Sequence, residues 1–396
     1  MRKIILILLC TTLLSASLID NNDDSINHGT FQGTAIEFVS SIKIGWNLGN
    51  SLDSHNNFNP NETAWGNPRI TQELMNGVAA QGFGAVRIPV TWGNMIGAAP
   101  NYTINAAYLN RVAQVVEFVR VAGMKAIINV HHDGADSHYW LSVKTAHLTG
   151  NSKANIDAQF IAVWTQIAQR FRDSNEFLIF EGFNELHDGS WSDGNNAQRN
   201  RINELNQIFV NTVRAAGGQN SNRFLLIHGW VTRPSVTVSS LVMPADTVAD
   251  RLIVGIHFYD PYEFTVAGSQ NRWGEKAMPR HWANERYVQG VFTSVKNRFV
   301  NNRIPVIMGE YGAVNIGTGA AHAHRKYYME YVTKCAVDNG IIPFYWDNGG
   351  FGTGRDKFGL LSRSNGNPRD AASAEIIQVM MKAAKEDYSI STITAP

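Results

Sequence analysis

Short apolar runs alternate with longer amphipathic stretches along most of the chain. Eight runs have the length and the β-branched or aromatic composition of strands buried on both faces, at residues 42–46, 85–90, 126–131, 177–183, 224–227, 252–258, 305–309 and 341–346. Between and after them, apolar residues recur with helical spacing at 70–81, 107–121, 156–171, 199–215, 287–299, 324–337 and 371–385. Strands that alternate with helices predict a parallel sheet. Eight such units in one run predict a closed (β/α)8 barrel of the TIM type, in the α/β class.

An open, doubly wound sheet is the main alternative to a barrel. It would carry a glycine-rich phosphate-binding loop between its first strand and a helix that follows at once. Gly45 and Gly49 do not belong to such a loop, because no helical pattern follows them directly. No linker rich in proline, serine or glycine divides the chain. We therefore expect one domain over residues 31–390 and a short tail at 391–396.

Two of the predicted strands lead into a glutamate. Residues 177–183 are followed by Asn184 and Glu185, and residues 305–309 are followed by Glu310. In a parallel barrel the carboxyl ends of the strands meet at one face, where the functional residues lie. Hydrolysis of a glycosidic bond needs two carboxylates, one to protonate the leaving oxygen and one to attack or stabilise the anomeric carbon. The two glutamates therefore predict a glycoside hydrolase.

The other strand ends are also rich in polar side chains, whose burial costs free energy unless they serve a site. They are Asn47, Arg87, His131, His132, Asp133, His228, His257, Tyr259, Asp260, Asp347 and Asn348. Seven tryptophans fall at or soon after a strand end: Trp46, Trp92, Trp140, Trp191, Trp230, Trp273 and Trp346. Because the C–H face of a β-linked sugar stacks on an aromatic ring, they predict an aromatic rim around a polysaccharide cleft. The alternative, for about half of them, is ordinary core packing.

Other interpretations fit some of the same residues. Glu185 and Glu310 could be structural ion-pair partners of Arg87. A metal site, as in barrel metallohydrolases, is another possibility, and its candidate ligands are His131, His132, Asp133 and His257. Such a site usually has a His-x-His pair on the first strand. The predicted first strand of this chain carries no such pair. We expect neither a metal nor a cofactor.

The first residues have the pattern of a secretory signal. A basic start at residues 1–3 is followed by an apolar run, too short to span a membrane, and by small residues that suit a cleavage site. We expect a signal peptide at 1–17, a flexible leader at 18–30 and a secreted protein. The net charge of +1 gives no electrostatic reason to expect nucleic acid or an anionic membrane as a partner.

Seven short motifs resemble those of glycoside hydrolase family 5. They occur in the order of that family and cover most of the chain. They are residues 45–50 (GWNLGN), 86–89 (VRIP), 129–134 (NVHHDG), 182–185 (GFNE), 257–261 (HFYDP), 308–312 (MGEYG) and 345–349 (YWDNG). The combination is most similar to the bacterial endo-β-1,4-glucanase branch, subfamily 4. Enzymes of that branch act on cellulose, mixed-linkage β-glucan or xyloglucan.

The resemblance implies a role for each central side chain. Glu185 would be the acid/base and Glu310 the nucleophile. Arg87 and Tyr259 match residues that hydrogen-bond the nucleophile and keep it ionised, and Asn184 matches the residue that holds the 2-hydroxyl of the sugar. If the two carboxyl groups lie about 5–5.5 Å apart, the reaction retains the anomeric configuration. We expect retention.

The remaining matched residues would line the substrate cleft. His131 and His257 match histidines of the family's active site, with His257 near the acid/base. Trp346 matches the platform under the sugar at the point of cleavage. Four further residues are expected to touch the substrate: Asn47, His132, Trp140 and Asn348.

The sequence therefore predicts a secreted, monomeric, retaining endo-β-1,4-glucanase that acts on cellulose-type glucans, lichenan or xyloglucan. Because clan membership does not fix the sugar, a mannanase or xylanase on the same scaffold is one alternative. A non-catalytic glycan-binding barrel is another. It would bind glycans without turnover, and the intact pair of glutamates argues against it.

Overall fold

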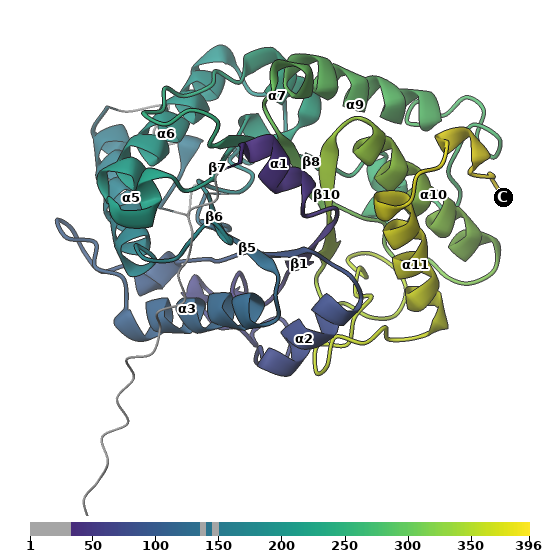
Figure 1. The fold of residues 1–396 in the computed structure, drawn as a ribbon, viewed down its shortest axis with the longest axis horizontal. Helices are drawn as coiled ribbons and strands as arrows, with labels where there is room; N and C mark the ends of the chain where they lie inside the picture. Colours follow the sequence, from purple (N-terminus) through teal and green to yellow (C-terminus); the bar gives the residue numbers. More distant parts are fainter. Residues whose placement is uncertain (1–32, 135–139, 145–149) are drawn as a thin grey trace, which may run out of the picture. The chain divides into compact units, whose positions relative to one another are not determined.

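The computed structural model describes residues 33–134, 140–144 and 150–396. Eight parallel strands form a closed barrel in the order β1-β10-β9-β8-β7-β6-β5-β4 (Figure 1). The strands are β1 (Gly45–Leu48), β4 (Ala85–Ile88), β5 (Lys125–Asn129), β6 (Leu178–Glu181), β7 (Leu225–His228), β8 (Leu252–Phe258), β9 (Val306–Tyr311) and β10 (Ile341–Asp347). This is the (β/α)8 barrel that the alternating pattern predicts, so the open sheet is excluded.

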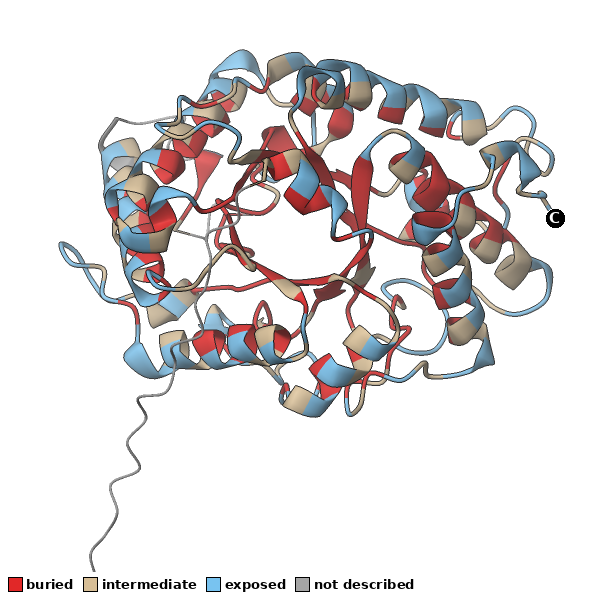
Figure 2. Ribbon diagram, in the orientation of Figure 1, coloured by how far each residue is buried: buried red, intermediate tan, exposed pale blue. Residues whose placement is uncertain are grey.

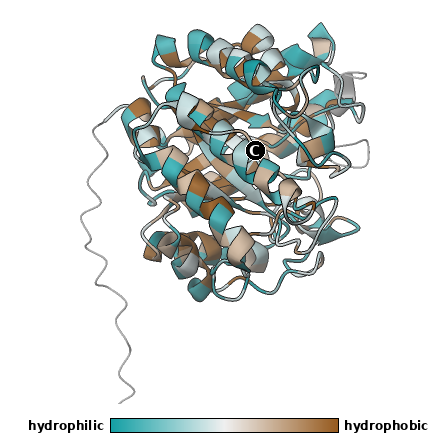
Figure 3. Ribbon diagram, turned by 90° about the vertical axis from the view of Figure 1, so that its right-hand side faces the viewer, coloured by the Kyte–Doolittle hydropathy of each residue, from teal (hydrophilic) through white to brown (hydrophobic). Residues whose placement is uncertain are grey.

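The helices lie mostly around the barrel and turn their buried faces toward it, while α1 crosses in front of the barrel in this view (Figures 1 and 2). They are α1 (Ala35–Ser40), α2 (Gln72–Ala80), α3 (Ala106–Val121), α5 (Gly150–Arg170), α6 (Asn196–Ala215), α7 (Pro234–Ser240), α8 (Tyr262–Thr265), α9 (Glu285–Arg298), α10 (Ala320–Asp338) and α11 (Ala371–Lys385). A hairpin of β2 (His55–Asn56) and β3 (Asn59–Pro60) extends the loop after β1. Hydrophobic and hydrophilic residues lie side by side along the helices (Figure 3), as expected for helices with one face on a core.

Local sequence determines where several of these elements begin. At the start of α6, the side chain of Asn195 accepts the backbone N–H of Gln198, and the side chain of Gln198 accepts the N–H of Asn195. This reciprocal capping satisfies two N–H groups that have no partner within the helix. At the start of β1, a Cβ atom on Gly45 would lie 2.2 Å from the ring of Phe344, so only glycine leaves room for this ring.

Several elements differ from the prediction, among them the first strand and the helix after β7. The first strand is predicted at 42–46 but lies at Gly45–Leu48, because Lys43 has a left-handed φ of 64° that interrupts extended backbone. The sequence pattern does not predict the helix after β7. This helix, α7, has only seven residues, too few for a clear helical period.

The barrel interior has a polar layer near the carboxyl ends of its strands. Side chains of a strand point alternately into the barrel and toward the helices. On the strands without a bulge, the inward residue two positions before the polar one is small or apolar, as in Ile127 before Asn129 and Ile179 before Glu181. The polar layer consists of Asn47, Arg87, Asn129, Glu181, His228, His257 and Glu310, all of them buried.

Four of the seven tryptophans expected at the rim are core residues instead. They are Trp46, Trp92, Trp230 and Trp273, each at most 1% exposed. Their indole N–H groups donate to buried or partly buried oxygens, such as Oδ2 of Asp347 for Trp46. They therefore pack the barrel rather than line a cleft. The exposed Trp65 and Trp282, which the sequence did not place at strand ends, are among the aromatic residues at the surface.

The structure describes the C-terminal end of the chain but not the N-terminal end. The predicted signal peptide at 1–17 and leader at 18–30 lie outside the described residues. At the other end, the predicted tail at 391–396 lies against the barrel, with Ile393 and Ala395 packed on the core. Within the described ranges, no helix has the length and apolar composition needed to cross a bilayer.

Candidate active site

Glu185 and Glu310 face each other at the carboxyl ends of β6 and β9. His257 on β8 lies between them, with its Nδ1 2.6 Å from Oε1 of Glu185 and 3.7 Å from Oε2 of Glu310. One atom of each of the three side chains lies within 4.8 Å of the others. This spacing fits the roughly 5–5.5 Å between carboxyl groups of a retaining glycosidase and not the roughly 6.5–9.5 Å of an inverting one.

An irregularity in β9 turns the side chain of Glu310 into the barrel. Ile256 of β8 pairs with Met308, but the next residue, His257, pairs with Glu310, so Gly309 is skipped. The register also shifts at this place against β10. Such a bulge changes the alternation of side chains by one residue. Glu310 therefore points inward although it lies two positions after Met308, which packs in the hydrophobic core.

Arg87 on β4 holds Glu310 from inside the barrel. Its Nη1 donates to Oε1 of Glu310 at 2.7 Å, and Tyr259 donates its hydroxyl to Oε2 at 3.1 Å. Because both oxygens of Glu310 accept a hydrogen bond, the ionised form is favoured. Arg87 is fully buried and also donates to Oδ1 of Asn184 at 2.7 Å and to Oδ1 of Asn47 at 3.0 Å.

Glu181 on β6 is a second carboxylate bound by Arg87, and the sequence analysis did not identify it. The Nε and Nη2 atoms of Arg87 donate to its two oxygens, both at 2.7 Å. Nε2 of His228 lies 3.0 Å from Oε1, and Nδ2 of Asn129 donates to the same oxygen at 3.2 Å. A sequence signal exists, since Glu181 is the one charge inside the apolar run 177–183 and a buried charge needs a partner.

Aromatic side chains form a wall beside the catalytic pair. The ring of His131 lies parallel to the indole of Trp346, with centroids 6.0 Å apart, and edge-on to His132 at 4.4 Å. Trp65 approaches His132 at 5.4 Å. We call these four residues the aromatic wall. They follow β1 and β5 or lie on β10, and their flat faces with polar edges suit the surface of a sugar ring.

Comparison with known proteins identifies the family. The family model described as cellulase (glycosyl hydrolase family 5) matches residues 49–352. The chain belongs to glycosyl hydrolase family 5. The predicted resemblance and the predicted class, a glycoside hydrolase, are therefore confirmed.

Relatives of this family 5 enzyme are endoglucanases. Endoglucanase A of Paenibacillus barcinonensis is 39% identical over 354 residues, which cover 84% of this chain and 86% of the relative. The xyloglucan-specific endo-β-1,4-glucanase of Bacteroides ovatus is 34% identical over 374 residues, which cover 89% of this chain and 71% of the relative. A solved structure, the subfamily 4 broad-specificity endoglucanase of Bacteroides salanitronis, matches with a TM-score of 0.86 at 45% identity. That match covers 89% of this chain and 95% of the solved chain.

Burial raises the pKa of both carboxylates of this family 5 enzyme, and their hydrogen-bond partners distinguish them. It raises the pKa of Glu185 above the usual value, and the charge of Arg87 opposes this only in part. Burial also raises the pKa of Glu310, against the effects of His257 and Arg87. Two carboxylates this close do not ionise independently. The donors on both oxygens of Glu310 favour its ionised form, which leaves the proton on Glu185.

Two histidines beside the pair, His131 and His257, are neutral near neutral pH. Burial lowers the pKa of His257 to about 3, and it lowers the pKa of His131 well below its usual range. A neutral His257 adds no positive charge beside the acid, so it does not counteract the raised pKa of Glu185. Its Nδ1 can still exchange a hydrogen bond with Glu185 during a proton transfer.

Two residues expected to touch the substrate are used in other ways. Asn47 is fully buried, where its Nδ2 donates to the carbonyl oxygen of Gly309 at 2.8 Å and its Oδ1 accepts from Arg87. It therefore positions Arg87, and its contact with the sugar stays a prediction. Asn348 is almost fully buried, and its Nδ2 donates to the carbonyl oxygen of Asp356 at 2.8 Å. It shapes the loop after β10.

The other expected contacts lie around the catalytic pair. His131, His132 and Trp346 belong to the aromatic wall. Oδ1 of Asn184 is taken by Arg87, so Nδ2 is the group that remains for a sugar hydroxyl. Trp140 is half-buried, and its contact with substrate stays a prediction.

The histidines and acids do not gather as the metal hypothesis requires. Oδ1 of Asp133 accepts the indole N–H of Trp140 at 2.6 Å, and its oxygens also accept the backbone N–H groups of Trp92 and Gly93. Asp133 therefore supports the loops. Among the described residues, potential ligand atoms of His131 and His132 approach Asp53 instead. The oxygens of Asp53 accept two backbone N–H groups of the loop after β1.

Replacing Tyr259 with phenylalanine should lower kcat about 10- to 100-fold, because a hydrogen bond to a charged group contributes about 1.5–3 kcal/mol. The change also removes a donor that favours ionised Glu310. The acid limb of the kcat/KM profile should therefore move to higher pH. The measurement is a pH–rate profile of both proteins. Tyr388→Phe, which removes a hydroxyl that donates to partly buried Glu330 at 3.0 Å, is the matched control and should match wild type. Equal profiles for all three proteins would contradict the role of Tyr259.

Proposed function

We propose that this enzyme is a secreted endo-β-1,4-glucanase that cuts internal bonds of cellulose-type glucans and retains the anomeric configuration. The observation that carries the proposal is the pairing of Glu185 and Glu310 across His257, all within 4.8 Å. The endoglucanase names of the relatives support the endo-acting part. No observation favours mannan or xylan over glucan, or binding without turnover.

The first step transfers the sugar to the enzyme. An oxygen of Glu310 attacks the anomeric carbon while the bond from that carbon to the glycosidic oxygen breaks. Glu185 gives its proton to that oxygen, so the leaving sugar departs as an alcohol. Glu310 becomes an ester and loses its charge, and Nδ2 of Asn184 is available to the 2-hydroxyl of the bound sugar.

The second step releases the sugar with water. Once Glu310 is an ester, its negative charge no longer raises the pKa of Glu185, and Arg87 now acts on Glu185 without that opposition. The pKa of Glu185 falls, so the same group accepts a proton from water. The water attacks the anomeric carbon, the ester bond breaks and Glu310 regains its charge. Two inversions give net retention.

The substrate class follows from the aromatic wall and from the relatives. We propose a β-1,4-linked glucose backbone, with its sugar faces on Trp346 and the neighbouring rings. Tolerance for mixed linkages or xylosyl branches is part of the proposal. It is supported by a relative named as xyloglucan-specific and by a structural neighbour named as broad-specificity.

We also propose that the enzyme acts outside the cell as a monomer. The basic and apolar start of the sequence supports export. One chain supplies both carboxylates and all of their described hydrogen-bond partners, so no second subunit is needed to complete the site.

The test is hydrolysis of carboxymethyl-cellulose, lichenan, xyloglucan, mannan and xylan by the mature protein, followed by reducing-sugar release. Proton NMR of the first product should show the β-anomer. We expect activity on the three β-glucans and little on the other two polymers. Activity confined to mannan or xylan would overturn the substrate, and a first-formed α-anomer would overturn the mechanism.

A further inference from the structure

The side-chain amide of Asn129 at the end of β5 has a fixed orientation. Its Oδ1 accepts the backbone N–H of Val90 at 3.1 Å, and its Nδ2 donates to Oε1 of Glu181 at 3.2 Å. Arg87 holds the pKa of Glu181 well below the usual value, so this carboxylate is ionised and can only accept hydrogen bonds. A flipped amide would set its oxygen against the carboxylate and its N–H groups against another N–H. Because Asn129 is fully buried, water does not compensate for such a loss.

The same amide nitrogen also contacts the ring of His131. Nδ2 of Asn129 lies 3.1 Å from Nδ1 of His131. An amide nitrogen only donates, and it has a second hydrogen besides the one that it gives to Glu181. Burial lowers the pKa of His131 well below its usual range, so the ring is neutral and carries one proton. Nδ1 therefore accepts from Asn129, and the proton of the ring lies on Nε2.

Nε2 is the end of this ring that remains for a ligand. Within the part of the chain that the structure describes, the contact with Asn129 is the one hydrogen bond that the ring of His131 forms. The ring belongs to the aromatic wall, where it lies parallel to the indole of Trp346. A protonated Nε2 donates to a sugar hydroxyl, whereas an unprotonated Nε2 only accepts. The tautomer of His131 thus determines the direction of a hydrogen bond to a sugar on this wall.

We infer that Asn129 is a positioning residue that fixes the tautomer of His131, so that its Nε2–H is directed to the substrate. The contact with a sugar rests on the proposed glucanase function, while the tautomer does not. The same amide also supports Glu181, which is held from other sides by Arg87 and His228. One buried side chain thereby joins the aromatic wall to the ion pairs beneath the nucleophile.

The first test is the ¹⁵N chemical shifts of the His131 ring, measured on protein with labelled histidine. The variant His131→Gln assigns these signals by their loss. In wild type we expect Nδ1 to have the shift of an unprotonated nitrogen and Nε2 that of a protonated one. In Asn129→Asp the carboxylate only accepts, so a proton should move to Nδ1. A protonated Nδ1 in wild type would overturn the inference, and so would an unprotonated Nδ1 in Asn129→Asp.

The second test asks whether Asn129 acts on the reaction through His131. A purely structural role would lower activity by the same factor whether or not His131 is present. We therefore compare kcat/KM on carboxymethyl-cellulose for wild type, Asn129→Asp, His131→Ala and the double variant. The loss caused by Asn129→Asp should be about 3- to 10-fold larger when His131 is present, which is the effect of one neutral hydrogen bond.

Equal losses in the two backgrounds would contradict a role of the tautomer in catalysis. If wild type hydrolyses no β-glucan, the proposed function fails, while the ¹⁵N shifts of wild type still decide the tautomer. The same spectrum decides it if Asn129→Asp does not fold.

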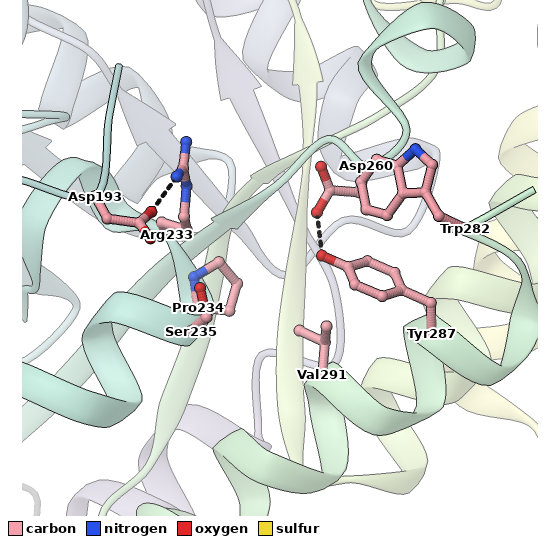
Figure 4. Close-up of a pocket in the computed structure, with 8 residues that line it drawn as sticks. All are labelled: Asp193, Arg233, Pro234, Ser235, Asp260, Trp282, Tyr287 and Val291. Carbon is pink, nitrogen blue, oxygen red and sulfur yellow. Dashed lines mark hydrogen bonds and ion pairs between the residues drawn. The ribbon is translucent and has the colours of Figure 1, made fainter. Parts of the chain in front are cut away.

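Two control variants should leave the ring shifts of His131 unchanged. Asn203→Asp alters an amide of α6 that is also fixed on both sides, but by backbone groups, a carbonyl oxygen and an N–H, both at 3.0 Å. Tyr287→Phe removes a hydrogen bond of 2.7 Å to Oδ2 of Asp260, in the pocket of about 380 Å³ that Figure 4 shows. If either control moved the proton of His131 to Nδ1, the contact with Asn129 would not be its cause and the inference would be wrong.

Discussion

Hydrolysis of carboxymethyl-cellulose should fall by roughly 10⁴-fold or more in Glu310→Ala, and by roughly 10²–10⁴-fold in Glu185→Ala. The first change removes the group that attacks the anomeric carbon. The second removes the proton donor for a leaving oxygen that cannot depart as an alkoxide. The measurement is reducing-sugar release over long incubations, with an active-site titration to exclude traces of wild type. Glu117→Ala, at a half-exposed glutamate on α3, is the control.

A substrate with an activated leaving group separates the two roles. Dinitrophenolate departs without a proton, so Glu185→Ala should form the glycosyl-enzyme from dinitrophenyl cellobioside at close to the wild-type rate. Glu310→Ala should remain inactive on it. Added azide needs no general base and should yield the β-glycosyl azide with Glu185→Ala. Equal loss of activity in both variants on both substrates would contradict the assignment, as would full activity of Glu310→Ala on the polymer.

Replacing Glu181 with glutamine should destabilise the enzyme by about 3–5 kcal/mol, because it breaks a fully buried ion pair and leaves Arg87 with one carboxylate instead of two. The acid limb of kcat/KM should move to lower pH, since a negative charge near Glu310 is lost. Denaturant unfolding, followed by tryptophan fluorescence, and a pH–rate profile measure the two effects. The control is Glu117→Gln, which breaks an exposed pair with Arg120 and should change the unfolding free energy by about 0–1 kcal/mol.

The contribution of Glu181 should also depend on pH. Burial raises its pKa, but the charge and hydrogen bonds of Arg87 outweigh burial and hold the pKa well below the usual value of 4.5. A carboxyl with a lowered pKa in the folded state stabilises the protein fully above its unfolded-state value and loses this effect as the pH falls below it. The stability difference between wild type and Glu181→Gln should therefore shrink in acid. An identical difference at neutral and strongly acidic pH would show that charge is not the cause.

The sequence predicts the barrel because both faces of each strand are buried, so the strands stand out as apolar runs. It predicts Glu185 and Glu310 because each ends such a run and lies in a family motif. Glu181 escapes detection because its partner, Arg87, is 94 residues away, and the local pattern does not show which strands become close. The network of Arg87 and Glu181 beneath the nucleophile therefore depends on strands that the closed barrel brings together.

A residue at the end of a strand can face the barrel interior or the helices, and a shift of one position along the strand changes which of the two it faces. Trp46 faces the helices and Asn47 faces inward, beneath the site, although both were expected to serve the cleft. Trp282, which the sequence pattern places in a helix-like stretch, lies instead in the loop before α9 and is exposed. The residue composition of the strand ends thus identifies the functional face of the barrel, while the direction of each side chain depends on the folded structure.

The bulge at Gly309 makes the pairing register, more than composition, the critical property of β9. Before it, Met308 serves the hydrophobic core, and after it the phase is inverted so that Glu310 serves chemistry. If β9 paired regularly over its present length, Glu310 would keep the phase of Met308 and its carboxylate would turn toward the helices. The apolar residues of this strand can therefore vary more freely than the irregular pairing at Gly309.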